Sequence, residues 1–413
     1  MSRIVIRDVA VLDATGREPS GRQDVLVEDG RISRIGRDLM LAPDVGSIDG
    51  GGCTLLPGLT DAHVHFALIG PRGDHGADSW VAHVLAVSRM VEGAIEEGFT
   101  TVRDAGGLEP AWAEAVARGL LSGPTILPSG SVISQTGGHG DQRLRHHGEQ
   151  ASSTIPGLVA GHVIADGIDE VRWAAREQLR RGATQVKLLA SGGIVSPTDP
   201  FDSVQLSLAE IGVAVEVARG WGTYVMAHCH TSPAIDVAVE AGVRSIEHAS
   251  ILEAATAARM AERGAFMVPT LQALESLAAH PDRWGLPPEK VLRLRDVADS
   301  AYRSIETARS AGVDIASGSD VVGPWQGRRG EELVYKSRVL GPHEAIISAT
   351  RTNARLFGLD ERIGTVEEGK QADIVLVIGE PLNDVAILAE PSSFRVVIRD
   401  GVVAKDSEGR VST

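Results

Sequence analysis

Cysteine is scarce in this sequence, and its scarcity excludes one class of protein. The 413 residues contain two cysteines, Cys53 and Cys229. Two cysteines cannot build a disulfide framework, and a chain of this length buries enough surface to fold without one. This cysteine usage favours a reducing compartment, so we expect a cytoplasmic protein.

Long apolar runs are also missing. No window approaches the ~18 uninterrupted apolar residues that a transmembrane helix needs. The N-terminal segment MSRIVIRDVAVLDATG has the pattern of a strand and a turn, without the apolar region and cleavage site of a signal peptide. We therefore expect no membrane partner.

Basic residues are outnumbered. Lysine and arginine total 40 against 55 acidic residues, which gives a net charge of −15. The acidic residues are spread along the chain, and no basic face is evident. Because nucleic acids and anionic membranes attract basic surfaces, the net negative charge argues against both as main partners, and it says little about a small-molecule substrate.

The middle of the chain alternates between β-rich runs and helical patterns. Eight runs are evident: 55–66, 100–105, 125–129, 185–190, 223–230, 245–249, 265–270 and 314–320. Strand–helix alternation with right-handed crossovers gives a parallel sheet. Eight units predict a closed (β/α)₈ barrel, and the absence of GxGxxG after the first run disfavours a dinucleotide-binding fold.

The two ends of the chain resemble each other. VLVEDGRISRIG near the start and VVIRDGVVAKD near the end each place Asp-Gly between two β-rich runs, which is a strong hairpin signal. IGTVEEGKQADIVLVI adds another turn and strand. We therefore predict one small β-domain from residues 1–56 and 357–413, with the barrel formed by residues 57–356.

Two connections between the predicted elements are long. Residues 131–168 follow the third run and are rich in Gly, His and Gln, and residues 271–288 follow the seventh. Long ordered loops in compact domains often bind ligands. In a barrel, both would lie over the face formed by the carboxyl ends of the strands.

The first candidate site is the HxH motif in GLTDAHVHF. His63 and His65 are two residues apart on a strand, so their side chains point the same way. Two neutral imidazoles on one face can chelate a metal ion. An equally weighted interpretation is a pair of polar barrel residues.

Further histidines and an aspartate stand at other strand ends. AHCH places His228 and His230 in one register, with Cys229 between them pointing outward as a small packed hydrophobe. His248 ends the sixth run and Asp320 ends the eighth. A single such residue is usually structural, but four strand ends in one barrel converge on one point.

Lys187 lies between apolar residues in QVKLLASGG. A free ammonium is costly in a core strand, so one interpretation is a buried ion pair. The other is a neutral lysine that has reacted with CO₂, because the resulting carbamate is an anion that can bridge two divalent cations.

These motifs together resemble the amidohydrolase superfamily. SQTGGHGD, VKLLASGG and the terminal run from HEAIISATRTNARLFG to ADIVLV are similar to its imidazolonepropionase-like and prolidase-like (aminoacyl-dipeptidase) branch, including ochratoxin-hydrolysing members. The resemblance implies a barrel with a β-sandwich from both termini, and a homo-oligomer, tetrameric or octameric. It implies these metal ligands: His63, His65, Lys187 as a carbamate, His228, His248 and Asp320.

The resemblance also implies a mechanism. Two divalent cations, most readily Zn²⁺ but also Mn²⁺ or Co²⁺, would share a bridging hydroxide that attacks an amide carbonyl. Asp320 would accept the proton of this hydroxide and pass it to the leaving amine. His139 and His230 would contact the substrate. Arg72 and Arg328, or its neighbour Arg329, are candidate partners for a substrate carboxylate, although exposed loop arginines are the more common case.

Four functions remain open. The first is hydrolysis of a peptide-like amide that releases a C-terminal amino acid, as in Xaa-Pro dipeptides, N-acyl amino acids or ochratoxin-like compounds. The second is hydrolysis of a non-peptide amide, carbamate, urea or lactam, such as a xenobiotic. The third is a single-metal deaminase, which Lys187 disfavours. The fourth is a non-catalytic scaffold, which the complete set of six ligands disfavours.

Overall fold

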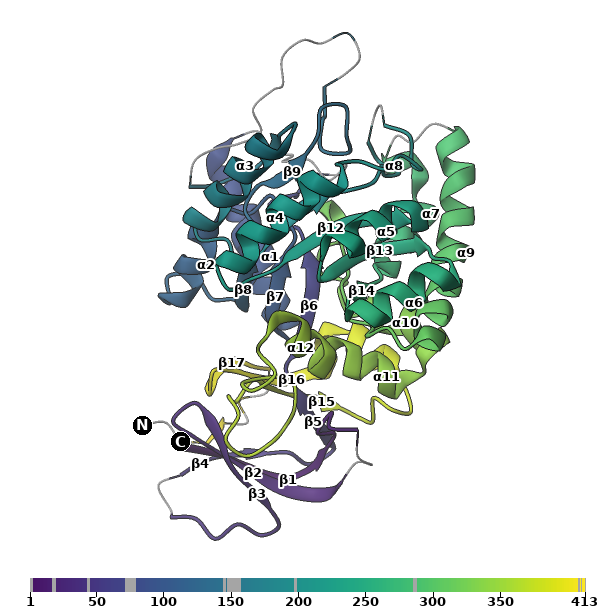
Figure 1. Cartoon of the computed structure of the whole chain (residues 1–413). Coiled ribbons are helices and arrows are strands. Elements are labelled where there is room, and N and C mark those ends of the chain that lie inside the picture. The colour runs from purple at the N-terminus through teal and green to yellow at the C-terminus, as the bar shows by residue number, and fades with distance from the viewer. Residues whose placement is uncertain are drawn as a thin grey trace.

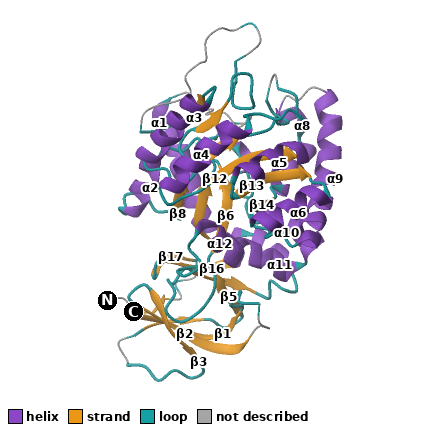
Figure 2. Cartoon of the chain, in the orientation of Figure 1, coloured by secondary structure: helices purple, strands orange, loops and turns teal. Residues whose placement is uncertain are grey.

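The computed structural model describes most of the chain. The described residues are 3–16, 20–42, 45–70, 79–143, 146, 157–196, 199–284, 288–407, 409 and 411–412. Strands lie at the centre of the larger part with helices around them, and a separate sheet carries both termini (Figures 1 and 2). This is the predicted fold class: a (β/α)₈ barrel with a small β-sandwich formed from both ends of the chain.

Parallel strands form most of the barrel wall. One three-stranded sheet contains β6 (Leu59–Val64), β7 (Phe99–Asp104) and β8 (Thr125–Pro128). A second sheet has the order β10 (His162–Ile164), β9 (Val132–Ser134), β11 (Val186–Leu189), β12 (Val225–Thr231), β13 (Ser245–Ile251) and β14 (Phe266–Val268). β9 continues the third barrel strand after β8 and pairs with β11.

Helices surround this wall and give each strand an apolar outer neighbour. They are α1 (Trp80–Glu96), α2 (Pro110–Ala117), α3 (Ile168–Arg180), α4 (Leu208–Gly220), α5 (Ser232–Ala241), α6 (Ala254–Arg263), α7 (Leu271–Ala279), α8 (Pro281–Trp284), α9 (Pro288–Ala311), α10 (Glu331–Leu340), α11 (Pro342–Ile347) and α12 (Asn353–Phe357). α4 begins with a capping box, in which Ser207 and Glu210 bond each other's backbone. α5 and α6 end at glycines in the left-handed conformation.

The predicted eighth strand closes the barrel without forming a regular strand. Within residues 314–320, a single parallel bridge joins Ile315 to Met267 of β14. On the other side, the Ala62 amide donates to the Ser317 carbonyl at 2.8 Å, and the Asp320 amide donates to the His63 carbonyl at 2.8 Å. Backbone hydrogen bonds on both sides therefore place this segment between β14 and β6.

The first predicted run, 55–66, is divided in the structure, so its assignment to one barrel strand was wrong. β5 (Cys53–Pro57) belongs to the terminal sheet, and the barrel begins with β6. The break falls at Gly58, where a Cβ atom would overlap the Thr100 side chain. Only glycine allows the chain to pass this close while it changes sheets.

The terminal sheet joins the two ends of the chain. Its order is β17 (Val402–Asp406), β16 (Phe394–Arg399), β15 (Ile374–Ile378), β5, β1 (Arg3–Val11), β2 (Ser20–Glu28) and β3 (Arg31–Gly36), with β4 (Gly46–Asp49) and β18 (Val411–Ser412) beside β1. Both predicted hairpins are confirmed. Asp29 and Gly30, like Asp400 and Gly401, have positive φ at both turn positions, as a type I′ turn requires. The domain boundaries at residues 56/57 and 356/357 stay a prediction.

The two predicted long connections differ. Residues 131–168 carry β9 and β10, and part of this connection lies outside the described residues. Residues 271–288 were expected to be a loop, which was wrong, because α7 and α8 occupy most of them. Leu271, Leu274 and Leu277 give this segment a buried apolar face at helical spacing.

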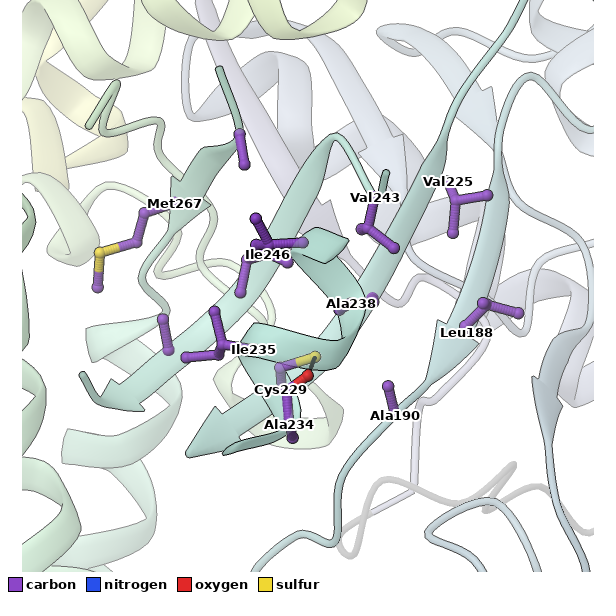
Figure 3. Packing of buried hydrophobic residues seen from close by; sticks show 14 of the residues in the cluster. Leu188, Ala190, Val225, Cys229, Ala234, Ile235, Ala238, Val243, Ile246 and Met267 are labelled. Carbon is purple, nitrogen blue, oxygen red and sulfur yellow. Dashed lines mark hydrogen bonds between the residues drawn. The ribbon is translucent and has the colours of Figure 1, made fainter. Parts of the chain in front are cut away.

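Cys229 has the position expected from its place between two histidines. It is fully buried and packs with Ala234 and Ile235 of α5, outside the barrel wall (Figure 3). Its neighbours His228 and His230 therefore point to the barrel interior. No helix within the described residues is long and apolar enough to cross a membrane.

Gly98 couples the barrel to the terminal sheet, and Gly98→Ala should destabilise the protein. Gly98 has φ +82°, and an added Cβ atom would overlap the ring of buried Phe394. Backbone strain and overpacking together should lower the free energy of unfolding by about 3 kcal/mol in urea denaturation. The matched control is Gly119→Ala, which has φ +69° and nothing within 4 Å of the added atom. It should lose only about 1 kcal/mol, and equal losses would contradict the packing explanation.

Candidate metal centre and active site

Two groups of side chains meet where the barrel strands end. His63, His65 and Asp320 form the first group, with potential ligand atoms within 4.8 Å of one another. The Nε2 atoms of His63 and His65 lie 3.6 and 3.4 Å from Asp320 Oδ1. The first and eighth strand positions of the barrel are neighbours, so residues far apart in sequence converge here as predicted.

Hydrogen bonds orient both imidazoles of this first group. His65 Nδ1 donates to the Gly106 carbonyl at 2.7 Å, and His63 Nδ1 lies 2.7 Å from Glu247 Oε2. With the proton on Nδ1, each ring presents the Nε2 lone pair to the centre of the site. Burial lowers the pKa of His63 to about 4, which keeps this ring neutral at pH 7.

The second group consists of His228, His230 and His248, again with ligand atoms within 4.8 Å. His228 Nε2 donates a hydrogen bond to the Gly192 carbonyl at 3.1 Å. The lone pair on Nδ1 of the same ring is therefore available to a metal ion. His230 Nδ1 lies 3.0 Å from the Ser250 hydroxyl, and His248 Nδ1 lies 2.7 Å from the Thr270 hydroxyl. Burial lowers the pKa of His228 and His248 well below the ordinary value, so both are neutral donors.

Lys187 lies next to the first group, and its charge also acts on the histidines of the second group. Its Nζ atom is 3.4 Å from His63 Nε2, and the residue is 2% exposed. Burial is the main cause that lowers the pKa of Lys187 to about 8. The nearest carboxylates, Glu247 and Asp320, oppose this effect without restoring the ordinary pKa. Lys187 therefore has a larger neutral fraction at pH 7 than an ordinary lysine, and the neutral form is the one that reacts with CO₂.

The backbone is unusual at two of the candidate ligands. His248 and Asp320 have φ of 71° and 54°, in the left-handed region that costs a non-glycine residue free energy. At His248 this conformation interrupts the alternation of β13. Glu247 and His248 can therefore both face the interior, although they are consecutive in sequence. Strain at metal-ligand candidates is consistent with a functional constraint.

His139, from the third connection, lies over the second group. Its ring stacks on His228 with centroids 4.5 Å apart, and its Nδ1 is 3.7 Å from Asp199. The His139 amide donates to Gln205 Oε1, and the Gln205 side chain donates to Asp199. The segment after β11 thus holds His139 in place, and Phe201 from that segment packs on His230 with centroids 4.8 Å apart.

The arginines proposed for a substrate carboxylate differ in their surroundings. Arg72 lies outside the described residues. Arg328 is exposed and pairs with Glu331, and Arg329 is buried and pairs with Glu97. Pairing with Glu97 makes Arg329 a structural residue, and a substrate contact by Arg328 stays a prediction.

Sequence reasoning missed the residues behind the ligands. Glu247 accepts from His63 and from Arg103, and Arg103 and Glu247 are both fully buried. Burial acts to raise the pKa of Glu247, but Arg103 and the His63 hydrogen bond lower it to about 2. The available signal was an acidic residue inside a β-run, directly before a candidate ligand. Asp199 and Gln205 carried no comparable signal.

The donor set fits divalent metal ions. Neutral imidazole nitrogens and a carboxylate converge in a buried site, and a lysine beside them can become a second carboxylate-like ligand. Imidazole and carboxylate ligation suits Zn²⁺ and its first-row neighbours. The four neutral imidazoles are those of His63, His228, His230 and His248. Without a cation to bind, burying them beside Lys187 would cost free energy and form few hydrogen bonds among them.

Comparison with known proteins shows the family of the chain. The model of the amidohydrolase family matches residues 54–404. The chain belongs to the amidohydrolase family. It is a hydrolase of amide bonds, and the family is generally metal-dependent.

Individual relatives are similar over most of their length. Ochratoxinase from Aspergillus niger is 34% identical over 366 residues, covering 85% of this chain and 75% of the relative. A prolidase solved with N-methylphosphonate-L-proline superposes with a TM-score of 0.93 at 36% identity, covering 98% of this chain and 100% of the other. A Xaa-Pro dipeptidase with bound methionine gives 0.86 at 29% identity, covering 97% and 99%.

Gly193→Ala should displace His139 and impair this amidohydrolase while its metal content stays equal to that of the wild type. An added Cβ atom would lie 2.6 Å from both ring nitrogens of His139. Misplacing a group that contacts the substrate by about 1 Å can cost ~100-fold in rate, so kcat should fall by that order. The control is Gly212→Ala in α4, where an added Cβ atom has nothing within 4 Å. Steady-state rates and metal content measure both effects; wild-type kcat in Gly193→Ala would show that His139 does not contribute.

Proposed function

We propose that this chain is a two-metal hydrolase that cleaves a peptide-like amide and releases a C-terminal amino acid. The observation that carries the proposal is the position of Lys187 beside two histidine groups. One group alone would serve a single ion. A lysine that can become a bridging carbamate favours two.

The ligands divide between the two ions. His63, His65 and Asp320 would hold the first ion, His228 and His248 the second, and carboxylated Lys187 both. When bound, divalent cations, most readily Zn²⁺, lower the pKa of water toward 7 and polarise the scissile carbonyl.

Asp320 would move the proton in this mechanism. Its carboxylate is 21% exposed while its histidine neighbours are more buried, so one side of it faces the substrate space. Burial acts to raise the pKa of Asp320, but His63, His65 and Lys187 lower it, which keeps the carboxylate ionised and able to accept a proton. An Asp320 Oδ atom would take the proton from the attacking water and deliver it to the leaving nitrogen, which must depart as an amine.

His139 and His230 would contact the acyl part of the substrate. His139 stacks over His228, and His230 lies between Phe201 and His248. A hydrogen bond from either imidazole to the developing oxyanion is worth ~2.7–4 kcal/mol in comparable enzymes. The Asp199 carboxylate, 3.7 Å from His139 Nδ1, would help to orient this ring.

The relatives support the class of substrate. One solved prolidase holds N-methylphosphonate-L-proline, in which a tetrahedral phosphorus attached to the proline nitrogen mimics the attacked carbonyl carbon of an Xaa-Pro bond. A second similar structure is a Xaa-Pro dipeptidase. We therefore place Xaa-Pro dipeptides and N-acyl amino acids first, with ochratoxin-like amides beside them because of the similarity to ochratoxinase.

A substrate panel tests this assignment. Purified protein loaded with Zn²⁺ should release the C-terminal amino acid from a subset of Xaa-Pro dipeptides and N-acyl amino acids. Amino-acid analysis of the reaction mixture measures this release. Carbamates, ureas, lactams and anilides without a carboxylate should be poor substrates. Turnover confined to these carboxylate-free compounds would overturn the proposal in favour of a non-peptide hydrolase.

Lys187→Ala tests the two-metal arrangement. Without the bridging group, both ions should be lost on dialysis and activity should fall to background, because the ligands that remain do not join the two groups. Elemental analysis of the variant measures the result. A variant that keeps two ions and full activity would contradict the role of the carbamate.

A further inference from the structure

A buried chain of charges connects the barrel interior to one metal-ligand candidate. Arg103 on β7 donates to Glu247 Oε1 at 2.9 Å, and Glu247 Oε2 accepts from His63 at 2.7 Å. None of the three side chains is more than 1% exposed. An ion pair is costly to bury, and the Arg103–Glu247 pair lies directly behind the ligand candidate His63.

Arg103 is held so that its charge is compensated and its geometry is fixed. It also donates to the Ala62 carbonyl at 2.7 Å and to the Ser245 hydroxyl at 3.0 Å. Tyr224 contacts the same guanidinium through its hydroxyl. The partners of Arg103 belong to three different segments of the barrel, so Arg103 fixes the Glu247 carboxylate relative to β6.

The hydrogen-bond partners of the site's imidazoles are unequal. Among the described residues, His65 and His228 bond to backbone carbonyls, and His248 bonds to the Thr270 hydroxyl. His63 differs from these three in that its Nδ1 bonds to a carboxylate that is not itself a ligand candidate. An anionic acceptor makes an imidazole a stronger donor to a cation than a neutral acceptor does.

The geometry points to Glu247, fixed by Arg103, as a positioning residue that makes the metal site of His63, His65 and Asp320 the tighter of the two. The two ions then bind in order, first at this site and second at His228 and His248. This inference rests on the proposed two-metal site. The first ion already has one more candidate ligand than the second, the Asp320 carboxylate, and Glu247 adds to that inequality.

The experiment is a chelator-competition titration of metal-free protein with Zn²⁺ in bicarbonate buffer. Wild-type protein should show two dissociation constants that are clearly separated. In Glu247→Gln the tighter constant should weaken roughly tenfold to hundredfold, and the weaker constant should change little. The matched control, Thr270→Val, removes the neutral partner of His248 and should change only the weaker constant.

A second variant covers the case in which Glu247→Gln, with Arg103 left unpaired, does not fold. The double variant Arg103→Met/Glu247→Met removes both charges at similar volume, which a core tolerates better than a single unpaired charge. It also leaves His63 without an acceptor. We expect a folded protein whose tighter constant is weakened at least as much as in Glu247→Gln.

A purely structural role predicts a different pattern. The melting temperature of the metal-free variants would fall while both dissociation constants stayed at wild-type values, and that result would overturn the inference. Equal weakening of both constants would also overturn it. Both outcomes are read from metal binding and stability, so neither depends on the substrate. If wild-type protein bound one ion or none, the two-metal proposal itself would fail.

Discussion

Burial of ionisable side chains inside the barrel is the constraint on which this site depends. Burial lowers the pKa of Lys187 and of four histidines, His63, His228, His230 and His248, and so disfavours their charged forms. Burial acts in the same direction on His65, but Asp320 raises the pKa of that ring. The same burial that makes them poor cations makes them good donors to a cation. The metals would therefore stabilise a cluster whose neutral donors are already assembled, and the fold supplies the assembly by ending its parallel strands at one face.

Much of the site could be predicted from the sequence because strands have a period of two. His63 and His65, and likewise His228 and His230, share a face for that reason, and Cys229 points outward. Glu247 could not be found in this way, because the left-handed backbone at His248 breaks the alternation. Arg103 acts across three strands, and no local pattern announces contacts of that range.

The fold was predicted best where a local rule decided the structure. Both Asp-Gly hairpins of the terminal sheet formed as expected, since the turn type requires those residues. The errors occurred where tertiary context decided. The run 55–66 changes sheets at Gly58, and residues 271–288 form helices that pack an apolar face instead of a loop. The segment at the eighth strand position is held by backbone bonds to both neighbours, without regular strand pairing of its own.

The central claim is that two cations share one carboxylated lysine. Anomalous diffraction at the zinc edge, from crystals grown with Zn²⁺ and bicarbonate, tests it most directly. The account predicts two anomalous peaks, one beside His63, His65 and Asp320 and one beside His228 and His248, with electron density extending from Lys187 Nζ between them. A single peak, with an unmodified lysine, would contradict it.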